Sequence, residues 1–351
     1  MSPQLSRRQL LGGGAGVGLV ALAGALGIEL NNHSSGPATT TTQTAGDAAS
    51  PLPTASSDWT FQRQTGPDRT VVRDTAGNQL AVLTDGARTV LLTGPSRTFT
   101  EPRTTTAVVQ SDAWVRLMPD AWHAGREQTP WFRSWFPKTL TDASPDLIGI
   151  AMQYEDGAPK IHDAKGLRIA GDAAFGPVVP GESQTSFHYR DEKSDFYDYL
   201  GIPWTFPDGS VQPEKARYGM LDCSGYMRMV YGYRGGYPLH LHNNKGVGLP
   251  RRAYAIAAYA PGVLLIPDTK RRPTDIGMLQ PGDMLFFAIN IGKPLAIDHC
   301  GMYLGEDTEG HPRFLSSRSQ ANGPTFGDIA GVARLDGNGF YAEGLRVARR
   351  L

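Results

Sequence analysis

Alternating apolar and polar positions predict short β-strands between residues 59 and 119 of this 351-residue chain. Apolar runs centre on Val71-Val72, residues 80–83, residues 90–92 and Val108-Val109. Turn-forming residues separate them, at Ala76-Gly77-Asn78, Asp85-Gly86 and Gly94-Pro95. Such a pattern is typical of antiparallel hairpins. Residues 120–186 are less regular and rich in tryptophan, which favours an aromatic core over a sugar-stacking surface.

The pattern changes after residue 190, where helical spacing comes first and short apolar runs follow. Helices are predicted over residues 195–200, 223–233 and 250–260, the last with proline in its first turn. Strands are predicted over residues 284–288, 299–304 and 313–317, because each run is apolar and bounded by turn residues. Helices followed by an antiparallel sheet indicate an α+β fold.

The first residues have the pattern of an export signal. Arg7-Arg8 precedes a glycine-rich apolar stretch that ends near Ile28, so residues 1–30 are predicted to be a twin-arginine signal peptide. An uncleaved membrane anchor is the alternative. Residues 31–57, rich in Thr, Ser, Pro and Ala, are predicted to be a disordered linker. We expect a β-rich domain at 58–188, a second domain at 189–351, and a secreted or cell-surface protein that meets the membrane only during export.

The composition excludes several classes of protein. The formal net charge is zero, which argues against nucleic-acid binding. Two cysteines, Cys223 and Cys300, are too few for a disulfide framework or a multi-cysteine zinc module. We expect a monomer without a cofactor. The arginine pairs Arg271-Arg272 and Arg349-Arg350 are predicted to lie in solvent.

One cysteine and one histidine form the candidate catalytic pair. Cys223 lies where a loop enters a predicted helix, so unpaired backbone N–H groups and the helix dipole favour its thiolate. His299 opens a strand well downstream, and a single such cysteine with a distant histidine is typical of a cysteine hydrolase. Cys300 follows on the same strand and should point to the opposite face, as a core residue and not as a disulfide partner of Cys223.

Five sequence blocks, in this order, carry a family resemblance. They are Tyr199-Leu200-Gly201-Ile202-Pro203-Trp204, Asp222-Cys223-Ser224-Gly225, Leu249-Pro250-Arg251, the nine residues 279–287, and His299-Cys300-Gly301-Met302-Tyr303-Leu304-Gly305. Residues 191–351 thereby resemble the NlpC/P60 peptidases, papain-like cysteine enzymes that cut bacterial cell-wall peptides. The resemblance implies a papain-like domain after the β-rich one.

The resemblance also implies residue roles. Cys223 would attack an amide carbonyl to give a thioester, and His299 would act as base and then as acid. The N–H of Cys223 or Ser224 would stabilise the oxyanion, with Asp222 at the cleft. The substrate would be a peptidoglycan stem peptide, cut between D-glutamate and a diamino acid.

Two positions depart from the family pattern. The third residue, which holds the imidazole by its other nitrogen, is commonly His and sometimes Asn or Gln, and here that position falls on Ser316. His311 and Gln320 are nearby substitutes. The entry motif has Trp204 where the family usually has tyrosine.

These departures leave two alternatives open: a catalytically weak or inactive wall-binding module, and an amidase or acyltransferase that uses the same Cys–His chemistry. His240 and His242 are a possible metal pair, but no third ligand stands at a helpful spacing, so we expect no metal.

Overall fold

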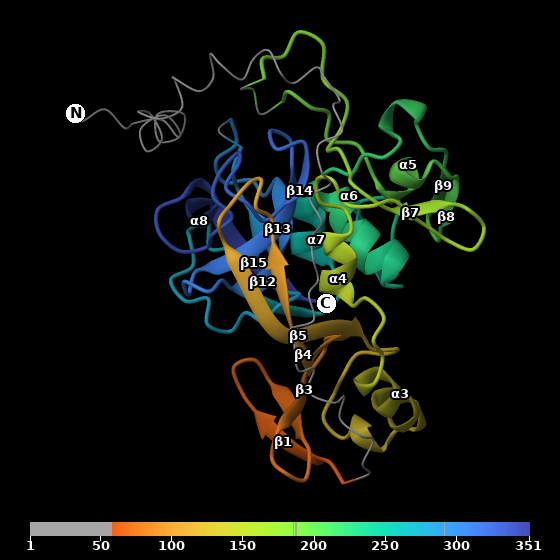
Figure 1. Ribbon diagram of the computed structural model, residues 1–351, viewed down its shortest axis with the longest axis vertical. Helices are drawn as coiled ribbons and strands as arrows, with labels where there is room; N and C mark the ends of the chain where they lie inside the picture. The colour runs from red at the N-terminus through yellow and green to blue at the C-terminus, as the bar shows by residue number, and fades with distance from the viewer. Residues whose placement is uncertain (1–57, 185, 187, 291) are drawn as a thin grey trace.

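The computed structural model describes residues 58–184, 186, 188–290 and 292–351 (Figure 1). It combines helices with mostly antiparallel sheets. The prediction of a mixed fold of helices and antiparallel sheet is therefore confirmed. The predicted signal peptide or anchor and the predicted linker lie outside the described residues. Within the described residues, no helix has both the length and the apolar character needed to cross a bilayer.

The first part is a five-stranded antiparallel sheet in the order β1-β2-β3-β4-β5. Its strands are β1 (Thr60–Gln64), β2 (Arg69–Arg73), β3 (Gln79–Thr84), β4 (Thr89–Thr100) and β5 (Val108–Leu117). The predicted strands are therefore confirmed. The turn predicted at Gly94-Pro95 is wrong, because these residues lie within β4, where the pairing with β5 shifts register between Thr93 and Arg97. A bulge absorbs the proline, so the strand continues.

An irregular segment follows, with η1 (Arg126–Gln128), α3 (Pro130–Leu140), α4 (Leu147–Met152), β6 (Ile161–His162) and β7 (Arg168–Ala170). Helix α3 covers the first sheet with its aromatic face. Phe132 and Phe136 stack at 4.8 Å between ring centroids, and Trp122 packs against Phe132 at 5.0 Å. The Trp122 indole N–H also donates to Thr70 Oγ1. The tryptophan-rich segment therefore builds a core, as predicted.

The remaining elements form the larger part of the molecule. They are α5 (Phe196–Leu200), β8 (Trp204–Phe206), β9 (Gly209–Val211), η2 (Lys215–Arg217), α6 (Cys223–Met227), the π-helix η3 (Arg228–Arg234), α7 (Ala253–Tyr259), β10 (Val263–Ile266), β11 (Met284–Phe287), β12 (His299–Glu306), β13 (Pro312–Arg318), β14 (Gly323–Thr325), α8 (Phe340–Gly344) and β15 (Leu345–Arg350). Six strands form one sheet in the order β10-β15-β11-β12-β13-β14. Helix α7 begins at Ala253, later than predicted, because Arg252 is extended.

The two faces of this sheet pack against different cores. Side chains of alternate residues on β11, β12 and β13 join the core around α6, and they are Met284, Phe286, Cys300, Met302, Leu304 and Leu315. The intervening side chains join a second core that includes α8, and they are Leu285, Phe287, Tyr303 and Phe314. This strict alternation fixes on which side of the sheet each site residue lies.

The core around α6 extends across the boundary predicted at residues 188 and 189. It contains Phe99 and Val109 from the β4–β5 hairpin, which runs from the first sheet into the larger part (Figure 1). The Glu101 carboxylate accepts hydrogen bonds from Thr325 Oγ1 at 2.7 Å and from the Phe326 N–H at 2.9 Å. The two parts of the chain therefore share one packed interior.

The prediction that Arg349 and Arg350 lie in solvent is wrong. Both are buried on β15. Arg350 pairs with Asp283 at 2.7 Å, and Arg349 donates to the carbonyl oxygens of Ala257 and Ala260. A buried carboxylate and helix-end carbonyls compensate the two desolvated guanidinium groups.

Candidate active site

The helix that carries the candidate nucleophile begins at Cys223 because Asp222 caps it. The buried Asp222 carboxylate accepts the Gly225 N–H at 2.7 Å and the Ser224 hydroxyl at 3.1 Å. Its carbonyl accepts the Tyr226 N–H. Within the described part of the chain, the N–H groups of Cys223 and Ser224 have no acceptor. These two donors are available at the positive end of the helix.

Gly225 allows the preceding segment to approach this helix closely. A Cβ at this position would lie 2.1 Å from the Ser194 carbonyl oxygen, closer than any real side chain tolerates. That carbonyl also accepts the Asp222 N–H at 2.9 Å, which fixes the cap. The glycine of the Asp-Cys-Ser-Gly motif is therefore required by packing.

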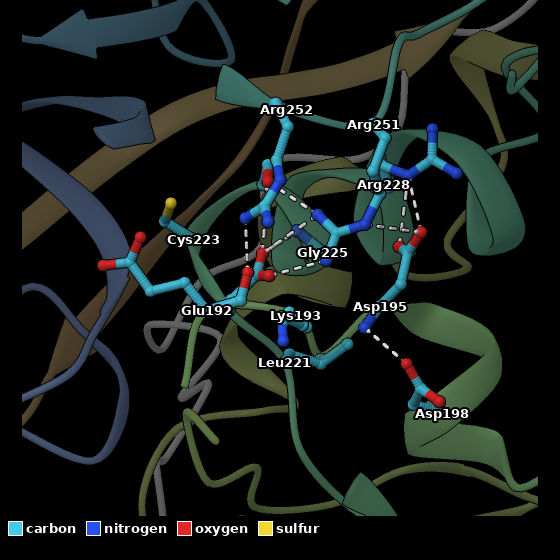
Figure 2. A network of polar contacts seen from close by, with 12 residues as sticks. Glu192, Lys193, Asp195, Asp198, Leu221, Cys223, Gly225, Arg228, Arg251 and Arg252 are labelled. Carbon is cyan, nitrogen blue, oxygen red and sulfur yellow. Dashed lines mark hydrogen bonds and ion pairs between the residues drawn. The ribbon is translucent and has the colours of Figure 1, made fainter. Parts of the chain in front are cut away.

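A buried network of charges holds the helix start in place (Figure 2). Arg251 pairs with Asp222 at 2.6 Å and with Asp195 at 3.3 Å, and it donates to Ser224 Oγ at 2.9 Å. Arg228, which is fully buried, pairs with Asp195 at 3.0 Å. Asp222 and Ser224, predicted to lie at the cleft, are thus buried members of this network. Their side chains hold the start of α6, which carries the candidate nucleophile, and they are shielded from solvent.

The Cys223 thiol, on α6, lies next to the residues that begin β12. Its Sγ donates to the Asp298 carbonyl oxygen at 3.9 Å, one residue before His299. Cys300, on the face toward α6, is completely buried, and both cysteines are free thiols. Burial and a hydrogen bond with Cys223 raise the pKa of the Cys300 thiol. The two thiols contact each other, and that Cys300 is not a disulfide partner of Cys223 stays a prediction.

His299 belongs to the opposite face of the sheet. Its ring lies 5.5 Å from the Tyr341 ring and 5.9 Å from the Phe287 ring, both in the second core. Its Nε2 is buried and has no hydrogen-bond partner among the described residues. Burial, together with the nearby Arg318 cation, lowers the pKa of His299 to about 3. The imidazole is therefore neutral at any physiological pH.

Ser316 lies on the same face as His299 but does not hold the imidazole. Its Oγ accepts a hydrogen bond from Arg318 Nε at 3.1 Å, and His299 Nε2 is left without a partner among the described residues. The role predicted for Ser316 is not formed in this structure. The substitutes do not fill it, since His311 pairs with Asp336 at 2.8 Å and Gln320 is exposed beyond the end of β13.

Trp204 and the histidine pair lie in other surroundings. Trp204 opens β8 and packs edge-on against Phe196 at 5.2 Å and Tyr233 at 5.5 Å, in an aromatic cluster beside α5. His240 and His242 both face Asp208, with Nδ1 to Oδ2 distances of 3.9 and 3.6 Å. Over the described ranges, no group of three or more His, Cys, Asp or Glu side chains is arranged to hold a metal ion.

Arg318, Tyr341 and Glu192 lie near the site and were not identified from the sequence. Tyr341 is close to both candidate residues: burial raises its pKa, the Arg318 cation opposes this rise, and the proximity of Cys223 adds to it. Burial and the neighbouring Asp222 carboxylate raise the pKa of Glu192 to about 7. Figure 2 shows the Glu192 carboxyl and the Cys223 thiol on the same side of the charge network. Glu192 is in contact with solvent, which screens its interaction with the Asp222 carboxylate.

Comparison with known proteins identifies one family. Residues 206–323, about a third of the chain, match the model of the NlpC/P60 family. No curated protein and no solved structure matches the chain. The matched range contains Cys223, His299 and Ser316. Proteins of this family are in general cysteine peptidases or amidases that act on cell-wall peptidoglycan. The C-terminal half of this chain therefore contains an NlpC/P60 domain, as its sequence blocks predicted.

Proposed function

We propose that this protein is an exported cysteine hydrolase that cleaves an amide bond in peptidoglycan stem peptides, with Cys223 as nucleophile and His299 as the proton-transfer group. One observation carries the proposal. Within the range matched by the NlpC/P60 family, the Cys223 thiol stands at a capped helix start, 3.9 Å from the carbonyl that precedes His299. A thiol in this position has helix N–H groups beside it, which favour negative charge on sulfur and on a nearby oxyanion.

The reaction would proceed through an acyl-enzyme. Cys223 sulfur bonds to the substrate carbonyl carbon while its proton passes to His299, and collapse of the tetrahedral intermediate breaks the C–N bond. His299 returns the proton to the departing amine, and water then hydrolyses the thioester. The N–H groups of Cys223 and Ser224, which have no acceptor among the described residues, are the donors available to the oxyanion. The bond between D-glutamate and a diamino acid is the proposed site of cleavage, on the resemblance to the family.

The test is digestion of purified peptidoglycan by the chain without residues 1–57. New amine termini are labelled and the fragments are weighed by mass spectrometry. The wild type should release stem-peptide fragments, Cys223→Ala should release none, and Cys300→Ala should keep most of the activity. If the wild type yields no more amine termini than Cys223→Ala at any pH, the proposal fails. A trapped acyl group that is not a stem-peptide fragment would indicate an amidase or acyltransferase instead.

A wall-binding module with little or no catalytic activity is the second candidate. Two observations favour it: His299 Nε2 has no partner in the part of the chain that the structure describes, and Ser316 is bonded to Arg318. A neutral imidazole without its orienting acceptor is a poor base at neutral pH. Sedimentation with insoluble cell wall distinguishes this candidate. Binding that survives Cys223→Ala, with no turnover by the wild type, would support the wall-binding module.

A further inference from the structure

A polar cavity of about 250 Å³ lies between the first sheet and the loop that precedes β11. We call it the glutamine cavity, because Gln64, Gln79 and Gln280 line it together with Arg69. Gln64 ends β1, Arg69 begins β2 and Gln79 begins β3, whereas Gln280 comes from the loop. None of the described lining residues is acidic, which argues against a site for a cation. The proposed reaction assigns no role to these side chains.

The register of the first sheet directs one of its faces toward this cavity. Gln64 pairs with Arg69, and Val71 pairs with Val82. Because Arg69 and Val71 are two residues apart on β2, all four side chains share a face. The opposite face, which includes Val72, belongs to the aromatic core under α3. The glutamine cavity therefore lies on the face of the first sheet that α3 does not cover.

One lining residue ties the two walls of the cavity together. Arg350, at the end of β15, donates to Thr84 Oγ1 on β3 at 2.8 Å and to the Met278 carbonyl oxygen of the loop at 3.0 Å. At Gly282 the loop approaches the first sheet so closely that a Cβ would lie 2.5 Å from Val115 Cγ1. These contacts fix the separation of the walls. The cavity is therefore preformed, as small-molecule sites usually are.

The hydrogen-bonding groups that remain open in the cavity are amides. The Gln79 and Gln280 side chains are half-buried and have no hydrogen-bond partner among the described residues. The guanidinium groups are already engaged, since Arg69 donates to Gln64 Oε1 and to three carbonyl oxygens of the β1–β2 turn, and Arg350 is paired with a carboxylate. An amide both donates and accepts, as a hydroxyl group does. The open groups therefore match a ligand rich in hydroxyls better than a small anion.

We propose that the glutamine cavity binds a sugar ring of the cell-wall glycan. The amides of Gln79 and Gln280 bond the ring hydroxyls. Val71, Val82 and Met278 offer an apolar surface to the C–H face of the ring. The cavity volume lies just below the range of about 300–1,000 Å³ for drug-sized ligands, which suits one sugar unit. This inference deepens the proposed function and rests on it for the source of the sugar.

The glutamine cavity is separate from the candidate active site. His299 pairs with Phe287 at one end of β11. Arg349, next to the lining residue Arg350, pairs with Met284 at the other end of this strand. The two ends are about 10 Å apart, at about 3.3 Å per residue. A sugar in the cavity therefore belongs to a part of the polymer other than the bond that is cut.

The test is a calorimetric titration of the chain without residues 1–57 with the trimer of N-acetylglucosamine, a sugar probe that contains no peptide. The wild type should bind this probe. The double variant Gln79→Ala, Gln280→Ala should bind it at least about tenfold more weakly, because two hydrogen-bonding side chains are lost. Neither side chain has a hydrogen-bond partner among the described residues, so the variant should remain folded. In the wild type, the side-chain amide NMR signals of Gln79 and Gln280, assigned by the single variants, should shift when the probe is added.

Gln110→Ala is the matched control, because Gln110 is an exposed glutamine on β5 outside the cavity. It should bind the probe as the wild type does, and so should Cys223→Ala. No binding up to about 10 mM probe overturns the proposal, and so does equal binding by a folded double variant. Displacement of the probe by inorganic phosphate would indicate an anion site and would also overturn it. These readouts need no hydrolysis, so their failure is distinct from failure of the proposed function.

Discussion

Replacement of Asp222 measures how much the charge network stabilises helix α6, which carries Cys223. This buried carboxylate both caps α6 and pairs with Arg251 at 2.6 Å. Asp222→Ala removes both contributions. Asp222→Asn keeps an oxygen for the Gly225 N–H and removes only the charge. The two variants together separate the cap from the ion pair.

The magnitudes follow from the contacts. Removal of one partner of a buried pair costs about 3–5 kcal/mol of unfolding free energy. The lower end applies because Arg251 keeps Asp195 at 3.3 Å and its side chain is 12 % exposed. Loss of the cap costs about 1 kcal/mol more. We expect about 3 kcal/mol for Asp222→Asn and about 4 kcal/mol for Asp222→Ala.

Equilibrium unfolding in urea, followed by tryptophan fluorescence, provides the measurement. Asp120→Ala is the control, since it breaks an exposed pair with Arg126 and should change the free energy by less than about 1 kcal/mol. If Asp222→Asn is as stable as the wild type, the pair with Arg251 does not hold the helix start. Equal unfolding free energies for Asp222→Asn and Asp222→Ala would instead show that the cap contributes nothing to stability.

Three further predictions concern the same region. Gly225→Ala should destabilise the fold by at least about 2 kcal/mol in urea, because its Cβ would clash with a backbone carbonyl. Gly339→Ala, in open space at the N-cap of α8, should cost less than about 1 kcal/mol. Burial and nearby carboxylates raise the pKa of Glu192 to about 7, so the folded state binds its proton more tightly and stability falls between about pH 4.5 and pH 7. Glu192→Gln should flatten this fall in urea midpoints, and an unchanged slope would contradict the assignment. Iodoacetamide should modify Cys223 and spare the completely buried Cys300 in the folded protein, as measured by peptide mapping. Modification of Cys300 at a similar rate would show that strand β12 opens readily and would contradict the prediction.

Much of the fold could be predicted because its signals are local. Two-residue alternation identified the strands of the first sheet, and the Asp-Cys-Ser-Gly motif identified the capped start of α6. Strand β15 was missed because its sequence, Leu-Arg-Val-Ala-Arg-Arg, resembles a solvated segment. The groups that compensate its arginines, Asp283 and the carbonyls of α7, come from distant parts of the chain. Local sequence patterns do not indicate such distant partners.

The site was only partly predictable for the same reason. Family spacing located Cys223 and His299, whose surroundings depend on the register between β12 and β13. That register brings Arg318 beside the imidazole and commits Ser316 to the guanidinium. Tyr341 comes from α8, which no motif identified. A sequence motif names the reacting groups, whereas their protonation is set by neighbours that only the folded chain brings together.

The β4–β5 hairpin makes the first sheet inseparable from the rest of the molecule. Its far end supplies Phe99 and Val109 to the interior around α6, and Glu101 accepts hydrogen bonds from the Thr325 hydroxyl of β14 and from the backbone N–H of Phe326. A fragment that begins at residue 189 would lose these contacts and expose part of the core around α6. Heat or denaturant should therefore unfold both halves in a single transition. A fusion of the second half to another protein would have to include the β4–β5 hairpin.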